Sequence, residues 1–151
     1  MSSFTTPLVI TPVDGLSDTF YLQEQFRYRI GDRNSKEIIE VPVGFITDGA
    51  SIPKIFQNIL SPWGDYGKCA VLHDFLYRYG QLGSQKASDQ LLLEAMEVAG
   101  VEKWKQFVIY RALRIGGWLT WRDYRKHDKE RINREQLVGF NYLSLNRNRE
   151  K

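Results

Sequence analysis

The sequence contains very little cysteine and histidine, and this scarcity excludes several kinds of site. Among its 151 residues there is one cysteine, Cys69, so neither an intramolecular disulfide nor a cysteine-based metal site can form. The two histidines, His73 and His127, are too few for a histidine-rich zinc or di-metal centre. Cys69 is therefore expected to act as a small buried hydrophobe on a helix.

Leader segments, long apolar runs and nucleotide-binding motifs are also missing. The N-terminal residues lack the basic region and apolar core of a signal peptide, and no apolar run is long enough to span a membrane. The glycine-rich phosphate-binding motifs and the GxSxG nucleophile motif do not occur. We therefore expect an intracellular protein with no signal peptide and no transmembrane segment.

The composition that remains is globular, with an uneven distribution of charge. Hydrophobic residues make up 42% of the chain, which suits one packed domain. Residues 1–121 carry a net charge of −1, whereas residues 122–151 carry +4. We expect a single domain over residues 1–121 and a basic C-terminal extension over residues 122–151. Such an extension suits an acidic partner, nucleic acid or an anionic membrane, or is a solvated helix face.

The first third of the chain has the period-two pattern of β-strands. Residues 20–30 and 37–43 alternate between apolar and polar side chains, and turn-forming residues 32–35 separate them. This pattern predicts a β-hairpin, with Pro42 placing the second strand at an edge or at its end. A further short apolar run covers residues 8–11, and a short helix is expected from Ser51 to about residue 60.

Three helices are expected after the strands, which gives an α+β fold. The first, over residues 65–79, is apolar all round and should be buried. The second should begin after a Ser84 cap and stop at Gly100, and the third should cover residues 102–115 and end at Gly116-Gly117. Its expected core face consists of Trp104, Phe107, Val108, Ala112 and Ile115. Residues 138–145 are expected to form a short strand or an extended arm. The predicted architecture is a small antiparallel sheet packed on a bundle of three to four helices.

The candidate site is a pair of side chains on the first two helices, His73 and Asp89. A short turn makes these helices antiparallel neighbours, so Asp89 can approach His73, fix its tautomer and leave the other ring nitrogen as a general base. Tyr77, one turn after His73, can complete the hydrogen-bond network. The alternative is a satisfied polar network that only orients the two helices.

Asp74 follows His73 directly but points to an adjacent helix face, because neighbouring residues of a helix lie about 100° apart. It is therefore free to bind a metal ion or a loop. A hard cation such as calcium prefers carboxylate and backbone oxygen atoms, and Asp48, beside the Gly49 turn, can supply a second ligand. The competing interpretation of this segment is a plain turn followed by a helix cap.

Three blocks of sequence, GFITDGASIP, AVLHDFLYRYG and KASDQLLLEAM, resemble an uncharacterised family of phage and prophage proteins, the domain of unknown function 1353. The resemblance covers roughly residues 38–117 and implies a phage or prophage origin, with no settled activity. The positions that match the family motif are Thr47, Asp48, Gly49, Ala50, Ser51, Pro53, His73, Asp74, Tyr77 and Asp89.

A second, local resemblance concerns HDFLY followed by SDQLL in the next helix. This arrangement is similar to the helical hairpin of calcium-dependent phospholipases that cleave the sn-2 ester. The resemblance implies that His73 is the base, Asp74 binds calcium and Asp89 orients His73. The glycine-rich calcium loop of those enzymes is not recognisable here, and their disulfides are absent.

Two functions follow as hypotheses. The first is a metal-assisted hydrolase encoded by a phage or prophage, acting on an ester of the bacterial envelope. The second is a virion or tail-assembly protein without catalysis, whose partners are other phage structural proteins. Either would work in the host cytoplasm or in the virion. Nucleic acid is the least favoured partner, because no DNA- or RNA-reading motif occurs.

Overall fold

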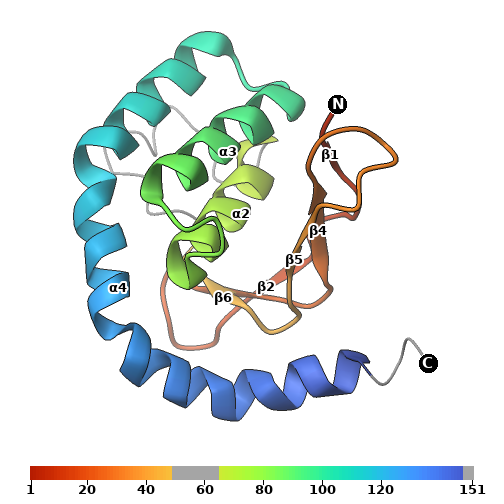
Figure 1. The fold of residues 1–151 in the computed structure, drawn as a ribbon, viewed down its shortest axis with the longest axis vertical. Helices are drawn as coiled ribbons and strands as arrows, with labels where there is room; N and C mark the ends of the chain where they lie inside the picture. Colours follow the sequence, from red (N-terminus) through yellow and green to blue (C-terminus); the bar gives the residue numbers. More distant parts are fainter. Residues whose placement is uncertain (49–64, 148–151) are drawn as a thin grey trace.

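The computed structural model describes the backbone of residues 1–48 and 65–147 and the side chains of residues 1–48 and 66–126. Strands occupy the N-terminal part and helices the rest, so the predicted α+β class is confirmed. The helices form one layer and the strands pack beside it (Figure 1). The expected helix from Ser51 to residue 60, and the motif residues Gly49, Ala50, Ser51 and Pro53, lie outside the described residues.

Six short strands form two antiparallel sheets of three strands each in the described part of the chain. One sheet has the order β1 (Ser3–Phe4), β4 (Phe26–Arg29) and β5 (Ile38–Val41); the other has β2 (Ile10–Pro12), β3 (Phe20–Leu22) and β6 (Ile46–Thr47). In the β4–β5 pair Phe26 lies opposite Val41 and Tyr28 opposite Ile39. The predicted hairpin is therefore present, and β5 ends directly before Pro42.

The prediction of one continuous strand over residues 20–30 is wrong. The chain changes sheets between Leu22 and Phe26, so that β3 pairs with β2 and β6 while β4 pairs with β1 and β5. At the crossing the backbone amide of Gln23 donates to Val9, 2.9 Å away, whereas the amide of Arg27 donates to the Thr6 hydroxyl, 2.8 Å away. Because alternation reports only which face is buried, it does not reveal this change of partner.

The first two described helices begin and end close to their predicted positions. Helix α2 covers Asp65–Tyr79 and helix α3 covers Gln85–Val98. The Ser84 hydroxyl accepts a hydrogen bond of 3.1 Å from the amide of Ala87, which satisfies a donor that the helix leaves unpaired. Gly100 follows α3 with φ +78°, the left-handed conformation that closes many helices.

Helix α4 is much longer than predicted and covers Lys103–Arg147. The helix does not end at Gly116-Gly117, and residues 138–145 are helical rather than a strand or an extended arm. The residues after position 125 are rich in lysine, arginine, glutamate and leucine, whose helix propensity outweighs the glycine pair. The proposed domain division between residues 121 and 122 falls inside α4, and the division itself stays a prediction. None of the helices in the described ranges is both long and apolar enough to cross a membrane.

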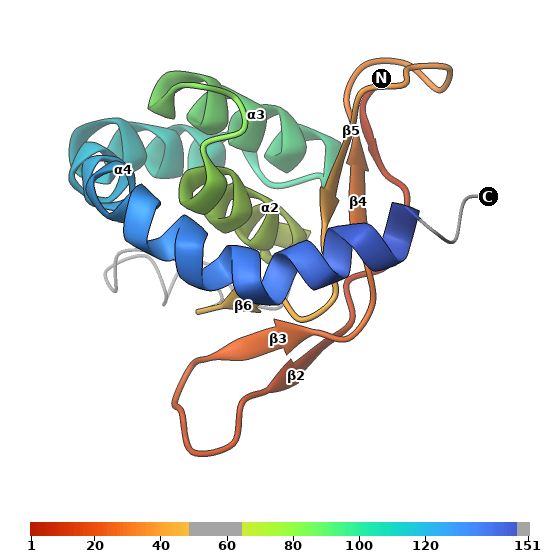
Figure 2. The same cartoon turned by 60° about the horizontal axis from the view of Figure 1, so that its bottom comes forward.

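The predicted core face of α4 is wrong for three of its five residues, while Val108 and Ala112 are partly buried. Trp104, Phe107 and Ile115 are 53%, 64% and 75% exposed, while Ile109, Leu113 and the polar Gln106 are buried. Helix α4 carries two apolar stripes, and only the weaker one faces the other helices. Periodicity finds such stripes but does not say which of two will be covered. Helix α4 curves around the outside of α2 and α3, and its second half passes along α2 toward the strands (Figures 1 and 2).

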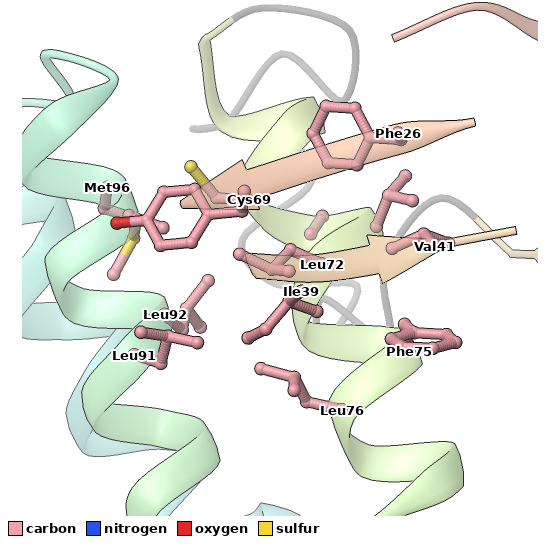
Figure 3. Close-up of a cluster of buried hydrophobic side chains, with 14 of the residues drawn as sticks. Phe26, Ile39, Val41, Cys69, Leu72, Phe75, Leu76, Leu91, Leu92 and Met96 are labelled. Atoms are coloured by element: carbon pink, nitrogen blue, oxygen red, sulfur yellow. The ribbon is translucent and has the colours of Figure 1, made fainter. Parts of the chain in front are cut away.

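The hydrophobic core lies between the β4–β5 sheet and helices α2 and α3. Figure 3 shows Phe26, Ile39 and Val41 of the sheet facing side chains of both helices. The helix residues of this core include Cys69, Leu72, Phe75 and Leu76 of α2 and Leu91, Leu92 and Met96 of α3. The Tyr28 hydroxyl donates a hydrogen bond of 3.1 Å to Glu94, which ties the sheet to α3. This packing fixes α2 and α3 against each other.

Arg125 joins α4 to the end of α2. Its Nη2 atom donates hydrogen bonds to the backbone carbonyls of Tyr77 and Arg78, at 2.8 and 2.7 Å. The last carbonyls of a helix have no partner within the helix, so these contacts cap α2. The guanidinium reaches them over Gly80, whose φ of +62° turns the chain away at this point.

Candidate functional site

The centre of the site is the carboxylate of Asp89, which is fully buried. His73 Nε2 lies 3.0 Å from Asp89 Oδ1, and the Tyr77 hydroxyl donates to the same oxygen at 2.5 Å. Arg114, from α4, donates to Oδ2 at 2.9 Å. The Asp89 carboxylate, which belongs to α3, therefore accepts hydrogen bonds from side chains of both α2 and α4.

These contacts determine the protonation of the group. Burial alone would raise the pKa of Asp89, but the hydrogen bonds from His73, Tyr77 and Arg114 outweigh burial and hold that pKa below its usual value. Asp89 is thus ionised at neutral pH and can only accept hydrogen bonds. The facing nitrogen of His73, Nε2, is then the hydrogen-bond donor, and Nδ1 is the ring nitrogen that Asp89 does not engage.

His73 also lines a hollow of about 180 Å³ that is partly open to solvent. Helices α2 and α4 form its walls, because Gly116 and Gly117 leave space between the two helices. The described residues that line it are Tyr66, Ala70, His73, Asp74, Tyr77, Ala112, Leu113, Gly116, Gly117, Thr120 and Tyr124. A small molecule or one ester group of a larger molecule fits such a volume, with the imidazole in its wall.

Asp74 lies beside His73 on the wall of the same hollow and is 6% exposed. Burial raises the pKa of Asp74; Arg78 opposes this effect, nearby Asp48 adds to it, and a hydrogen bond with Thr47 opposes it, with a net rise. Arg78 Nη2 lies 3.6 Å from Asp74 Oδ2, which is an ion-pair distance but not a hydrogen bond. The carboxylate is therefore held in a place that disfavours its negative charge.

The oxygen atoms around Asp74 suit a hard cation. Among the described residues Asp74 Oδ2 is buried without a hydrogen-bond partner, and the positive charge next to it is the Arg78 guanidinium at 3.6 Å. Thr47 is fully buried on β6, and Asp48 follows it with an exposed side chain. Within the described ranges no three histidine, cysteine or acidic side chains gather, so a cation here would take further oxygen ligands from the backbone or from water.

The structure brings the predicted residues into two adjacent groups. His73, Tyr77 and Asp89 are in direct contact, and Asp74, Thr47 and Asp48 lie next to them. Their catalytic and metal-binding roles stay predictions. Sequence reasoning missed Arg114 and Tyr124, which come from the inner face of α4, and Gln85, which donates to the Tyr77 hydroxyl at 3.2 Å.

Gly117 permits the close approach of α4 to this network, and a larger residue should disrupt it. A Cβ atom at position 117 would lie 2.6 Å from the Tyr77 hydroxyl oxygen and 3.2 Å from Gln85 Nε2. Asp89 and Gln85 hold that hydroxyl in place, so it cannot easily move away. We expect Gly117→Ala to lower the free energy of unfolding by about 1–3 kcal/mol, as in other overpacked sites. Urea denaturation measures the change.

Gly116→Ala provides a matched control one residue away. A Cβ atom at position 116 meets nothing within 4 Å. Alanine is also the better helix former by about 1 kcal/mol, so Gly116→Ala should be neutral or stabilising. Equal effects of the two substitutions would contradict the close contact at Gly117.

Comparison with known proteins gives a family but no characterised relative. Residues 20–113, which include Thr47, His73, Asp74, Tyr77 and Asp89, match the family described as "Protein of unknown function (DUF1353)". No curated protein and no solved structure matches the chain. The match covers the strands from β3 onward, α2, α3 and the start of α4, and therefore both groups of site residues. The chain belongs to the DUF1353 family.

Proposed function

We propose that the protein is a metal-assisted hydrolase that uses His73 as a general base. The observation that carries this proposal is the placement of the His73 ring, which lines the open hollow while Asp89 holds its Nε2 atom. A buried carboxylate that fixes the tautomer of a histidine is a common way of preparing the other nitrogen to accept a proton.

The proposed reaction is hydrolysis of an ester held in the hollow. His73 takes a proton from a water molecule as the water oxygen forms a bond to the ester carbonyl carbon. The bond from that carbon to the alcohol oxygen then breaks, and the proton passes from His73 to the leaving alcohol. Asp89 stays ionised and stabilises the transient imidazolium, while Tyr77 and Arg114 hold Asp89 in position.

Asp74 is the proposed ligand of a divalent cation, with calcium favoured and Asp48 and Thr47 as neighbours. Bound there, the cation would supply positive charge for the oxygen atom on which negative charge develops. The resemblance to phage and prophage proteins favours an ester of the bacterial envelope as the substrate, with action in the host cytoplasm or from the virion.

Substitution of Asp74 by asparagine is expected to raise the melting temperature of the cation-free protein and to remove the stabilisation that calcium gives the wild type. The folded-state pKa of Asp74 is raised, so its charge destabilises the fold at neutral pH, and this cost is relieved as the pH falls through that pKa. Asp74→Asn removes the charge and should raise the melting temperature of the cation-free protein. Calcium at a hundredfold excess over its dissociation constant should stabilise the wild type by about 2.7 kcal/mol and leave the variant unchanged.

Thermal unfolding with calcium, magnesium, manganese and chelator measures both effects. Asp14→Asn is the matched control, because Asp14 is exposed on the turn between β2 and β3 and should change neither. A melting temperature of the wild type that responds to none of these cations would refute the cation site. Cleavage of phospholipid and short-chain esters that persists in the Asp74→Asn variant would refute its role in the reaction.

A non-catalytic role in the virion or in tail assembly is the second candidate. The observation that favours it is the convergence of His73, Tyr77 and Arg114 on Asp89, which joins helices α2, α3 and α4. Such a network serves helix packing whether or not a reaction takes place. Co-purification with a tail or baseplate protein, together with no hydrolysis of any envelope ester, would favour this function.

A further inference from the structure

The outer face of α4 carries a continuous stripe of exposed aromatic, aliphatic and arginine side chains. We name it the outer stripe, and its residues are Trp104, Phe107, Arg111, Ile115, Trp118, Leu119 and Arg122. Each of them lies three or four residues from another member, which places all seven on one side of the helix, over a length of about 27 Å. The five apolar members are between 45% and 75% exposed.

Exposure of this kind is unusual for a protein that works alone in water. Ile115, at 75%, is among the most exposed large hydrophobic residues of the described chain, although it is in the middle of a helix. Contiguous apolar surface with a polar rim is typical of an interaction site. Ile109 and Leu113, by contrast, are buried against the other helices, so α4 has two apolar faces with one of them uncovered.

The cations of the outer stripe lie directly over its aromatic rings. The Arg122 guanidinium carbon is 4.7 Å from the centre of the Trp118 ring, and that of Arg111 is 5.8 Å from the Phe107 ring. Over residues 103–126, where side chains of α4 are described, the helix carries seven lysine and arginine residues and one acidic residue, Asp123. Lys103, Lys105 and Arg114 are paired with acidic side chains of the protein itself. The outer stripe, however, holds two arginines and no acidic residue, so it favours an occupant that carries negative charge.

We propose that the outer stripe binds the surface of an anionic lipid membrane, with α4 lying in the plane of the interface. Amphipathic helices of this type bury tryptophan, phenylalanine and leucine at the boundary of the acyl chains, while arginine reaches the phosphate groups. A second copy of the chain fits less well, because its outer stripe would offer Arg111 and Arg122 no acidic side chain. A nucleic acid would leave Ile115 and Leu119 without an apolar partner, since these side chains cannot stack on bases.

This inference is independent of the hydrolase proposal. The α4 residues that line the hollow include Leu113 and Gly117, which lie on the opposite side of the helix from the outer stripe. Loss of membrane binding and loss of hydrolysis can therefore be measured separately. Substitutions in the outer stripe should leave the cation-dependent thermal shift at Asp74 unchanged.

Flotation of the full-length protein with lipid vesicles tests the proposal. We expect it to float with vesicles that contain phosphatidylglycerol, to stay in solution with pure phosphatidylcholine, and to be released by salt. The double variant Arg111→Gln/Arg122→Gln should bind about 25-fold more weakly, since each cation near an anionic surface contributes about a fivefold factor. Phe107→Ser/Trp118→Ser should also reduce binding, because it removes the inserted rings.

The matched control is Leu16→Ser/Ile46→Ser, which removes two exposed apolar side chains from the strand region instead. This control should float like the wild type, and circular dichroism should show that all variants are folded. The proposal would be overturned if the wild type did not float with phosphatidylglycerol vesicles. It would also be overturned if the folded Arg111→Gln/Arg122→Gln variant floated as well as the wild type. So would a wild-type dimer that Phe107→Ser/Trp118→Ser dissociates, because the outer stripe would then be a contact between copies.

Discussion

Replacement of Asp89 with alanine is expected to lower the free energy of unfolding by about 3 kcal/mol. The substitution removes the acceptor of three hydrogen bonds and leaves His73 and the Tyr77 hydroxyl inside the protein without it. Loss of one partner from a buried charged pair costs about 3–5 kcal/mol. The lower figure applies because the Arg114 side chain is 34% exposed and can turn to water. Urea denaturation followed by tryptophan fluorescence gives the change directly.

The pH dependence of this loss identifies its electrostatic part. The pKa of Asp89 is lower in the folded protein than in the unfolded chain. The ionised carboxylate therefore stabilises the fold at pH values above its pKa in the unfolded chain. This stabilisation is lost as the pH falls through its pKa in the folded protein. The difference between the wild type and Asp89→Ala should therefore narrow below about pH 4. Asp89→Asn, which preserves shape, should show a smaller loss. A difference that stays constant down to the lowest pH would mean that packing alone is responsible.

Replacement of His73 with glutamine is expected to reduce ester hydrolysis by about 10²–10⁴-fold, the usual contribution of a positioned general base. Glutamine is chosen because its amide can still donate to Asp89, so the fold should change little. The hydrolysis rates of the wild type and the variant on the same envelope lipid, with calcium present, give the ratio. Circular dichroism and the melting temperature establish that the loss is chemical.

The double variant His73→Gln/Asp89→Asn separates a working pair from two independent residues. If Asp89 acts only through His73, the double variant should be no slower than His73→Gln alone, because residues that act as a unit are strongly non-additive. Additive losses would contradict the positioning role of Asp89. Full activity in His73→Gln would exclude this histidine as the base and leave the network with a structural role.

The ends of α2 and α3 could be predicted from the sequence because local signals mark them. Ser84 caps α3, Gly100 closes it, and the turn at Gly80 and Gly83 lies between the two helices. The length of α4 could not be predicted in the same way, since the glycine pair does not end the helix and its second member, Gly117, permits a close contact. Whether Gly117 stops a helix or brings two helices together depends on Tyr77, which lies 40 residues earlier in the chain.

The candidate site was predictable where it rests on one helical hairpin. His73 and Asp89 lie on neighbouring helices joined by a short turn, so their contact follows from local structure. Arg114 comes from a third helix, and its approach depends on which stripe of α4 faces inward. The polar Gln106 and the glycine pair on the inner face were the available signals, because buried polar residues and glycines in a helix indicate close packing. These signals were overlooked because the outer stripe is more hydrophobic and therefore predicts the wrong core face of α4.

The contact of Arg125 with the last carbonyls of α2 holds the first residues of the basic C-terminal segment against the end of that helix. A chain shortened at residue 121, where the composition suggests a boundary, would lose the guanidinium that closes α2 and also Tyr124 from the wall of the hollow. The same contact links the course of α4 to the turn of α2 that carries Tyr77. The last turn of α2 is thus held in part from the middle of α4, 48 and 47 residues further along the chain.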